Sequence, residues 1–148
     1  MNMKILPSVR WLVTAGFLFH PSVSPAAPLP GINLSAAAFA SGKIPGRDGW
    51  DYLFPRPADV RYFSESGMKL FRLPFLWERL QPTLMGPLDA AYLQHIRDFV
   101  TQAEAAGAKV LLDMHDYAQY NGRLIGSDAV PVSAFQDVWH KLEAFFKN

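Results

Sequence analysis

The chain has 148 residues, half of them apolar, which is enough for one globular domain with a single core. Its 14 basic and 13 acidic residues give a formal net charge of +1, and no Lys- and Arg-rich run has the pattern of a phosphate-binding surface. The composition therefore argues against a nucleic-acid partner. The absence of cysteine excludes a disulfide scaffold and a thiolate metal site.

The first residues have the pattern of a secretory signal. Lys4 and Arg10 precede a short apolar run over residues 11–19, and small residues and prolines follow as far as Ala26. The alternative, a membrane anchor, needs about 20 continuous apolar residues, and this run is about half that length. We therefore predict a signal peptide over residues 1–26 and a secreted protein, extracellular or periplasmic, with no membrane contact after cleavage.

Beyond the signal, short apolar runs alternate with amphipathic helical stretches, as in proteins whose parallel strands are joined by crossover helices. The predicted strands are residues 32–37, 69–74 and 109–115. The predicted helices are residues 57–66, residues 89–106 with Asp89 as the N-cap, and a last helix that begins near Pro131. The strand starts recur at a spacing a little above the roughly 31 residues of a β/α-barrel unit. The pattern predicts an α/β fold, the first three β/α units of a TIM-type eight-stranded barrel.

Polar side chains lie toward the carboxyl ends of the predicted strands. Alternation places Arg72 on the face of its strand opposite the apolar Phe71, and sets Asp113 and His115 on one face of the next strand. Asn33 takes the matching place in the first strand. In a β/α barrel these strand ends form the rim that carries functional groups.

Arg72 needs a carboxylate partner, because an unpaired buried charge is strongly destabilising. Asp113 can provide it from within this chain, and a carboxylate elsewhere in a complete barrel can do the same. Arg72 is therefore either half of a structural ion pair or a functional group, and His115 is either a hydrogen-bonded core histidine or a ligand contact. Asp113 lies deeper, and we predict that it holds Arg72 or a ring nitrogen of His115 in place.

Aromatic and amide side chains gather in the loops after the second and third strands. Trp77 follows the second strand, and Tyr117, Tyr120 and Asn121 follow the third. Flat apolar rings beside amide and hydroxyl groups are suited to stacking on sugar rings while bonding their hydroxyls. We predict that Trp77, Tyr117 and Asn121 contact a saccharide, with loop-anchoring packing as the alternative for the rings.

Two other tryptophans, Trp50 and Trp139, are predicted to lie in the core. The triplet that starts at Asn33 matches a glycosylation sequon. Because it lies in a strand expected to be buried, we discount it as a modification site.

Several segments together resemble one known family. They are residues 31–35 (GINLS), 43–47 (KIPGR), 71–82 (FRLPFLWERLQP), 86–89 (GPLD) and 112–117 (LDMHDY), with Asn121 and Gly122. In this combination the sequence after the predicted signal resembles the N-terminal part of glycoside hydrolase family 5, the secreted cellulases. The resemblance implies an eight-stranded β/α barrel that hydrolyses β-1,4-glucan with retention, uses no metal or organic cofactor and is secreted.

The resemblance also implies roles for single residues. Arg72 matches the arginine that supports the nucleophilic carboxylate in this family, and His115 matches the histidine that contacts the sugar next to the cleaved bond. Tyr117 and Asn121 fall in a loop that makes sugar contacts. Asp116 stands where the family commonly has Asn, which exchanges a hydrogen-bond donor for a charge.

Retaining cleavage needs two carboxyl groups about 5 Å apart. The family supplies them as glutamates after the fourth and seventh strands, and we expect both beyond Asn148. We therefore expect residues 27–148 to be a partial barrel domain, truncated before its fourth strand and inactive alone. The expected substrate-binding residues are His115, Tyr117, Trp77, Asn121 and Asn33.

The expected partner is a β-glucan polysaccharide, and the full-length protein is expected to be a monomer. Two alternatives stay open. One is a non-catalytic carbohydrate-binding remnant, and the other is the same fold acting on mannan, xylan or mixed-linkage glucan.

Overall fold

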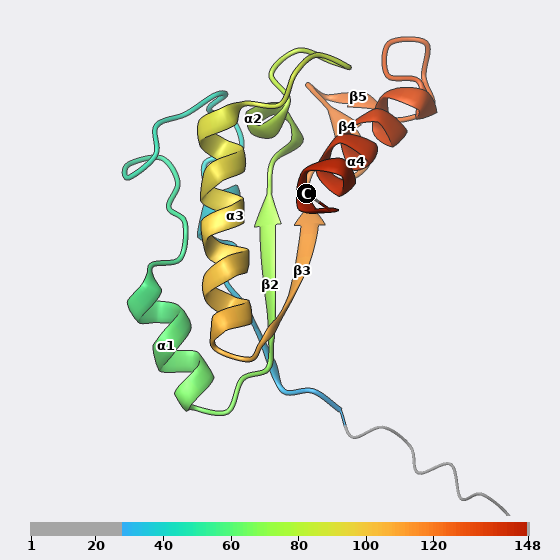
Figure 1. Cartoon of the computed structure of the whole chain (residues 1–148). Helices are drawn as coiled ribbons and strands as arrows, with labels where there is room; N and C mark the ends of the chain where they lie inside the picture. The colour runs from blue at the N-terminus through green and yellow to red at the C-terminus, as the bar shows by residue number, and fades with distance from the viewer. Residues whose placement is uncertain (1–27, 148) are drawn as a thin grey trace, which may run out of the picture.

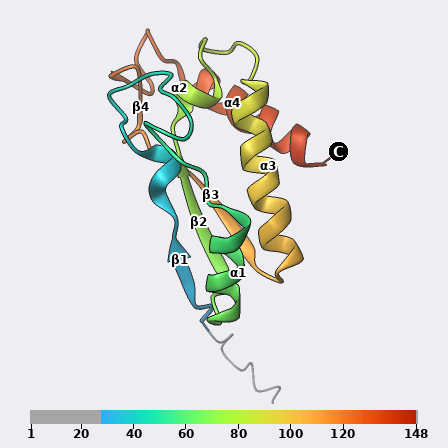
Figure 2. The ribbon, with the colours of Figure 1, turned by 90° about the vertical axis from the view of Figure 1, so that its left-hand side faces the viewer.

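A computed structural model describes residues 28–147 of the chain. Three strands form a parallel sheet in the order β1-β2-β3, where β1 is Gly31–Asn33, β2 is Leu70–Phe75 and β3 is Lys109–Met114. Figures 1 and 2 show the sheet from two sides, with the carboxyl ends of the strands at the top. Within the described residues, β1 and β3 each pair with a neighbour on one side only. The predicted signal peptide, residues 1–26, lies outside this part of the chain.

Helices follow the strands in the predicted alternation. Helix α1 spans Pro57–Glu65, α3 spans Ala90–Ala105 and α4 spans Val132–Lys147. The Asp89 side chain accepts the backbone N–H of Tyr92 at 2.8 Å, so the predicted N-cap of α3 is confirmed. In Figure 1, α3 runs alongside β2, and α1 lies beside α3 on the side away from β2. The α/β prediction and all of the predicted helices are confirmed.

The core lies between the sheet and α3. Phe71, Leu73 and Phe75 are fully buried on this face of β2, and the ring of Phe71 lies 6.2 Å from that of Phe99 on α3. Burying side chains of this size contributes about 1.5–3 kcal/mol each. Because side chains alternate along a strand, Arg72 points to the opposite face, as predicted. That face is the one that carries the polar groups.

The first strand is shorter than predicted. Strand β1 ends at Asn33, and Ser35–Ala38 form a 3-10 helix, η1. The N–H of Leu34 still donates to the carbonyl of Arg72 at 3.0 Å before the chain turns away. The predicted strand included residues 35–37, but the Ser and Ala side chains of this run have little preference for a strand.

Two short elements were not predicted. Helix α2, Trp77–Leu80, follows β2 directly, and β4 (Gln119–Tyr120) pairs antiparallel with β5 (Arg123–Leu124). The turn of this hairpin is Asn121 and Gly122, with φ angles of 48° and 72°. Asn-Gly is the pair that a tight hairpin turn favours, so the sequence did contain the signal.

Of the two tryptophans predicted to lie in the core, only one does. Trp139 packs against the core with its ring 6.2 Å from that of Phe75, so its predicted place is confirmed. Trp50 was predicted to lie in the core, and that prediction is wrong, because the side chain is 77% exposed and contacts Arg47 at 5.4 Å. Asn33, expected to be buried, is also exposed.

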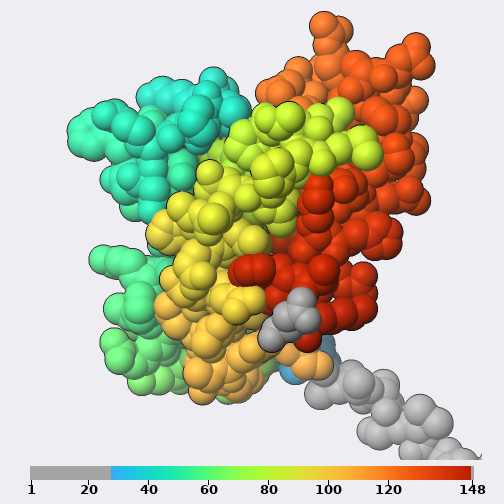
Figure 3. Space-filling view, turned by 45° about the horizontal axis from the view of Figure 1, so that its top comes forward, coloured from blue at the N-terminus to red at the C-terminus, as the bar shows by residue number. Residues whose placement is uncertain are grey.

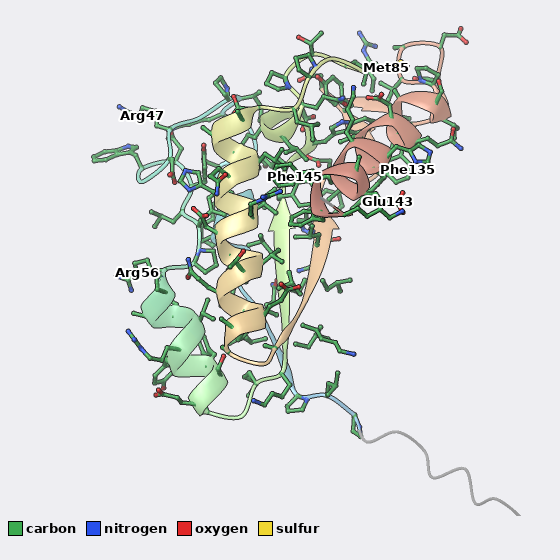
Figure 4. All side chains as sticks on the ribbon, in the orientation of Figure 1. Arg47, Arg56, Met85, Phe135, Glu143 and Phe145 are labelled. Atoms are coloured by element: carbon green, nitrogen blue, oxygen red, sulfur yellow. The ribbon has the colours of Figure 1, made fainter. Side chains whose placement is uncertain are left out.

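Helix α4 packs beside α3 and the segment that leads out of α2, as the space-filling view shows (Figure 3). Figure 4 shows Phe145 near the end of α4, beside α3. Arg97 of α3 lies over the Phe145 ring at 3.9 Å and donates to the Phe145 carbonyl at 3.0 Å. Over residues 28–147, no helix is both long and apolar enough to cross a membrane.

Candidate functional site

The carboxyl ends of the three strands share one hydrogen-bonded network. Arg72 donates from Nη1 to Asn33 Oδ1 at 2.7 Å, and from Nη2 to Asp113 Oδ2. His115 Nδ1 lies 2.9 Å from the same Asp113 oxygen. The strand register explains the arrangement, because Asn33 is the direct neighbour of Arg72 in the sheet. The predicted convergence of Asn33, Arg72 and His115 is confirmed, while their roles toward a ligand stay predictions.

Asp113 sets the tautomer of His115. Nδ1 is 2.9 Å from the Asp113 carboxylate and 3.2 Å from Nη2 of Arg72, which is always a donor. Because an ionised carboxylate only accepts hydrogen bonds, the shorter contact, from Nδ1 to Asp113, is a hydrogen bond in which Nδ1 carries the proton. Nε2 then becomes the ring nitrogen available to a ligand. Asp113 holds both Arg72 and His115 in place, as predicted.

A pocket of about 340 Å³ opens beside His115. Its lining comes from the first loop, which is the segment between β1 and α1 (Ala38 and Ser41), from α2 (Glu78), and from the loop and hairpin after β3 (His115, Asp116, Tyr117, Gln119 and Gly122). Tyr117 is 79% exposed, and its ring lies 5.0 Å from that of His115 with 55° between the planes. An exposed ring beside an imidazole offers both an apolar face and a hydrogen-bonding nitrogen.

Two acidic side chains, neither of them predicted to have a role, support this loop. Asp116 accepts the backbone N–H of Trp77 at 2.8 Å, and buried Glu78 accepts the backbone N–H of Asn121 at 2.6 Å. Both side chains also line the pocket. Burial, with a further contribution from the charge of Glu78, raises the pKa of Asp116 to about 7. The one signal in the sequence was Asp116 itself, at a position where the resembling family commonly has Asn.

The prediction that Trp77 contacts a sugar is wrong. Its side chain is 0% exposed, and its indole N–H donates to Gln81 Oε1 at 2.9 Å. The ring packs edge-on against Tyr120 at 4.9 Å and Phe135 at 6.1 Å. A buried ring has no face open to a ligand, so the alternative of loop-anchoring packing is confirmed for Trp77.

Arg79 on α2 is a buried cation that the sequence analysis did not single out. Its side chain donates to the carbonyl oxygens of Ala37, Phe39, Ala40, Lys43 and Pro45. The guanidinium also lies 4.3 Å from the centre of the Tyr52 ring. All these partners belong to the segment between β1 and α1. Arg79 therefore fixes the first loop, which forms one wall of the pocket.

An Arg79→Met variant is expected to lose about 2 kcal/mol of unfolding free energy. Hydrogen bonds from a charged donor contribute about 1.5–3 kcal/mol each, but the exposed carbonyl groups can bond to water once Arg79 is removed, so the losses do not add up in full. The buried carbonyl of Ala37 keeps a donor, the Tyr92 hydroxyl at 3.2 Å. Urea unfolding measures the loss. Arg47→Met is the matched control at a side chain that is 72% exposed, with an expected change within about 0.5 kcal/mol. Equal losses in the two variants would contradict the anchoring role.

Over the described range 28–147, no three His, Asp or Glu side chains are grouped closely enough to hold a metal ion. The polar groups at the strand ends bond to one another instead, with Arg72 in the centre. The arrangement is suited to binding a polar, uncharged ligand and to holding a carboxylate near the guanidinium.

Comparison with known proteins decides the family. The family model for cellulase (glycosyl hydrolase family 5) matches residues 30–148. The chain belongs to glycosyl hydrolase family 5. Over 119 residues it is 39% identical to endo-beta-1,4-glucanase B of Aspergillus niger, and this match covers 80% of this chain and 34% of that protein. The chain thus spans about a third of the length of the curated relatives it matches.

Solved structures of glycosyl hydrolase family 5 proteins superimpose on the chain. An endo-beta-1,4-glucanase from Xanthomonas axonopodis pv. citri is 44% identical with a TM-score of 0.79, over 81% of this chain and 38% of that one. Endoglucanase Cel5A from Pseudomonas stutzeri, in complex with cellobiose, is 40% identical with a TM-score of 0.78, over 81% and 36%. The parallel sheet with its helices is therefore an N-terminal portion of the family's β/α barrel, as predicted.

Proposed function

We propose that this chain is part of a secreted endo-β-1,4-glucanase that cleaves β-1,4-glucosidic bonds with retention and acts as a monomer. The observation that carries the proposal is the network of Asn33, Arg72, Asp113 and His115 at the strand ends of a glycosyl hydrolase family 5 fold. The match to endo-beta-1,4-glucanases supports the reaction class. The cellobiose complex of the Pseudomonas stutzeri relative supports a β-glucan ligand. Secretion rests on the signal pattern of residues 1–26.

Each residue of the network has a distinct role in this proposal. Arg72 is a fixed, permanently charged group, held by Asn33 and Asp113, and it supports the nucleophilic carboxylate. His115 presents Nε2 to a hydroxyl of the sugar next to the cleaved bond. Tyr117 offers an exposed ring for stacking, and Asn121 lies at the turn of the hairpin beside the same pocket.

Asp116 and Glu78 are not the catalytic pair of this proposal. Retaining cleavage places its two carboxyl groups about 5 Å apart, with the sugar between them. These two side chains instead accept the backbone N–H groups of Trp77 and Asn121, which holds the loop in place. We therefore propose that both catalytic glutamates belong to later strands of the barrel, outside the chain, and that the chain alone is inactive.

A hybrid enzyme tests the proposal. Residues 28–147 would replace the matching segment of the Xanthomonas endoglucanase, so that the barrel is complete. The hybrid is expected to release reducing sugar from carboxymethylcellulose, and the 148-residue chain alone is expected to release none. A hybrid that melts cooperatively but does not hydrolyse the substrate would overturn the proposal. Faster hydrolysis of mannan or xylan would replace the proposed substrate.

In this hybrid, His115→Ala is expected to lower kcat/KM about tenfold, equivalent to about 1.4 kcal/mol, because one hydrogen bond to the sugar is lost. His140→Ala is the matched control, since the side chain of His140 is 77% exposed on α4. Initial rates on a soluble cello-oligosaccharide measure both variants. Equal rates in the two variants would show that His115 makes no contact with the sugar.

A further inference from the structure

The hairpin formed by β4 and β5 rests on α2, although the whole of α3 and β3 separates these elements along the chain. The Tyr120 hydroxyl donates to the carbonyl of Gln81, the residue that ends α2, at 2.8 Å. The Tyr120 ring also packs against the buried Trp77 ring at 4.9 Å. These contacts hold β4 in place, and the turn that follows it, Asn121 and Gly122, is held by a different bond.

The turn has an uncommon backbone conformation at Asn121. Its φ of 48° places a non-glycine residue in the left-handed region, where such a residue stays only if surrounding contacts hold it. The backbone N–H of Asn121 donates to Glu78 Oε1 at 2.6 Å, and the residue as a whole is exposed. Because the Cα–Cβ bond is fixed relative to the backbone, this contact also sets the direction in which the side-chain amide leaves the turn.

Glu78 is a rigid acceptor for this bond. It lies in α2 between Trp77 and Arg79, whose side chains are buried in the core and bonded to the first loop. The Glu78 side chain is itself buried, and a buried carboxylate needs hydrogen-bond donors such as the Asn121 N–H. Hydrogen bonds to an ionised carboxylate are about twice as strong as those between neutral groups. The position of the turn is therefore set from α2.

The network at the strand ends is held in a different way. Arg72 bonds to Asn33 and Asp113, which belong to the neighbouring strands, and Asp113 also holds His115. These bonds run across the sheet and include neither Glu78 nor the hairpin turn. The two groups meet in the pocket, which both His115 and Glu78 line. Loss of the Glu78 carboxylate therefore loosens the turn and leaves Arg72 in place.

We propose that Glu78 is a positioning residue that acts through Asn121: its carboxylate holds the Asn121 N–H and so directs the side-chain amide of Asn121 toward the sugar. The hold on the turn stands on the contacts of this chain alone, whereas the effect on sugar binding rests on the proposed function. Because the strand-end network does not depend on Glu78, its loss weakens binding and leaves the cleavage rate of the bound sugar unchanged.

Amide hydrogen exchange of the 148-residue chain, followed by NMR, tests the hold on the turn. In Glu78→Leu, protection of the Asn121 amide is expected to fall at least about tenfold. Glu78→Gln keeps a weaker, neutral acceptor, so a fall of about threefold is expected, and this variant decides the test if Glu78→Leu folds poorly. Glu104→Leu and Glu104→Gln, at an exposed position of α3, are the matched controls. Unchanged protection of Asn121 in the Glu78 variants overturns the proposal.

Kinetics of the hybrid enzyme on a soluble cello-oligosaccharide test the action through Asn121. Glu78→Leu is expected to raise KM about tenfold and to leave kcat within about twofold. Asn121→Gly removes the side-chain amide but keeps the N–H, and glycine readily adopts a positive φ. In that background Glu78→Leu is expected to raise KM less than about twofold. A residue that merely stabilised the fold would raise KM equally in both backgrounds, which would overturn the proposal.

The two measurements separate failure of this proposal from failure of the proposed function. A hybrid that hydrolyses the substrate with the same KM in the wild type and in Glu78→Leu removes the positioning role and leaves the proposed function standing. A folded hybrid without hydrolysis, together with loss of Asn121 protection in Glu78→Leu, overturns the proposed function and leaves the hold on the turn.

Discussion

A Trp77→Ala variant is expected to lose about 3–5 kcal/mol of unfolding free energy, the range for truncation of a fully buried tryptophan. The indole is 0% exposed and packs against Tyr120 and Phe135, so its removal leaves a cavity in the core. Its N–H donates to the side chain of Gln81, which is itself fully buried and loses a partner. Urea unfolding followed by circular dichroism measures the loss.

Trp50→Ala is the matched control, because it makes the same chemical change in the opposite environment. Trp50 is 77% exposed and contacts the equally exposed Arg47, so its expected cost is within about 0.5 kcal/mol. If both variants lose the same free energy, Trp77 does not anchor the core. A small loss at Trp77 together with weaker sugar binding would restore its sequence-based role as a sugar contact.

Arg72→Lys in the hybrid enzyme is expected to lower kcat about 100-fold, equivalent to about 2.7 kcal/mol, with little change in KM. Arg72 donates to Asn33 and Asp113 from two different nitrogens, which holds the guanidinium in one orientation. A lysine ammonium is a point charge on a flexible chain and cannot reproduce that fork. The nucleophilic carboxylate then loses its support while the sugar contacts stay in place.

Steady-state kinetics on a soluble cello-oligosaccharide separates this role from a structural one. Arg61→Lys, at an exposed position of α1, is the matched control and is expected to leave both constants unchanged. A rise in KM with unchanged kcat in Arg72→Lys would mean that Arg72 binds the ground state of the sugar instead. A fall in melting temperature that accounts for the lost activity would mean that Arg72 acts only on stability, through its ion pair with Asp113.

The sequence predicted the strand-end network well because the rule behind it is local. Side chains alternate along a strand, so the burial of Phe71 and Leu73 on one face required Arg72 to lie on the other. Parallel pairing then brings the ends of β1, β2 and β3 to one edge, where Asn33 and Arg72 meet in register. Alternation was sufficient for that step, and the N-cap Asp89 was predicted from its residue type and position.

The two tryptophans were misplaced because nothing local determines their exposure. Trp77 follows directly after a strand, at the place where a loop begins, yet it is buried by Tyr120 and Phe135, which lie far along the chain. Trp50 lies in a Gly- and Pro-rich segment without periodicity, and the residues around it leave it exposed. Large aromatic side chains occur in both settings, so their identity alone does not predict which one applies.

The proximity of Asp116 to Glu78 also could not be predicted from the sequence. The two residues are separated by the whole of α3 and β3, and they meet only because β2 and β3 are neighbours that end at the same height. An Asp in place of the commoner Asn marked the position as unusual. Its partner, its burial and its raised pKa depend on where α2 turns, and that short helix was not predicted.

The bonds that Arg79 makes to the first loop determine an order of events during synthesis. They join residues 34 to 42 positions apart, so their donor leaves the ribosome only after the whole of α1 and β2 has been made. The carbonyl groups of residues 37–45 cannot bond to Arg79 until that residue has been made, and contacts of such long range form late in folding. The first loop in the chain is thus completed only after the second strand has been translated.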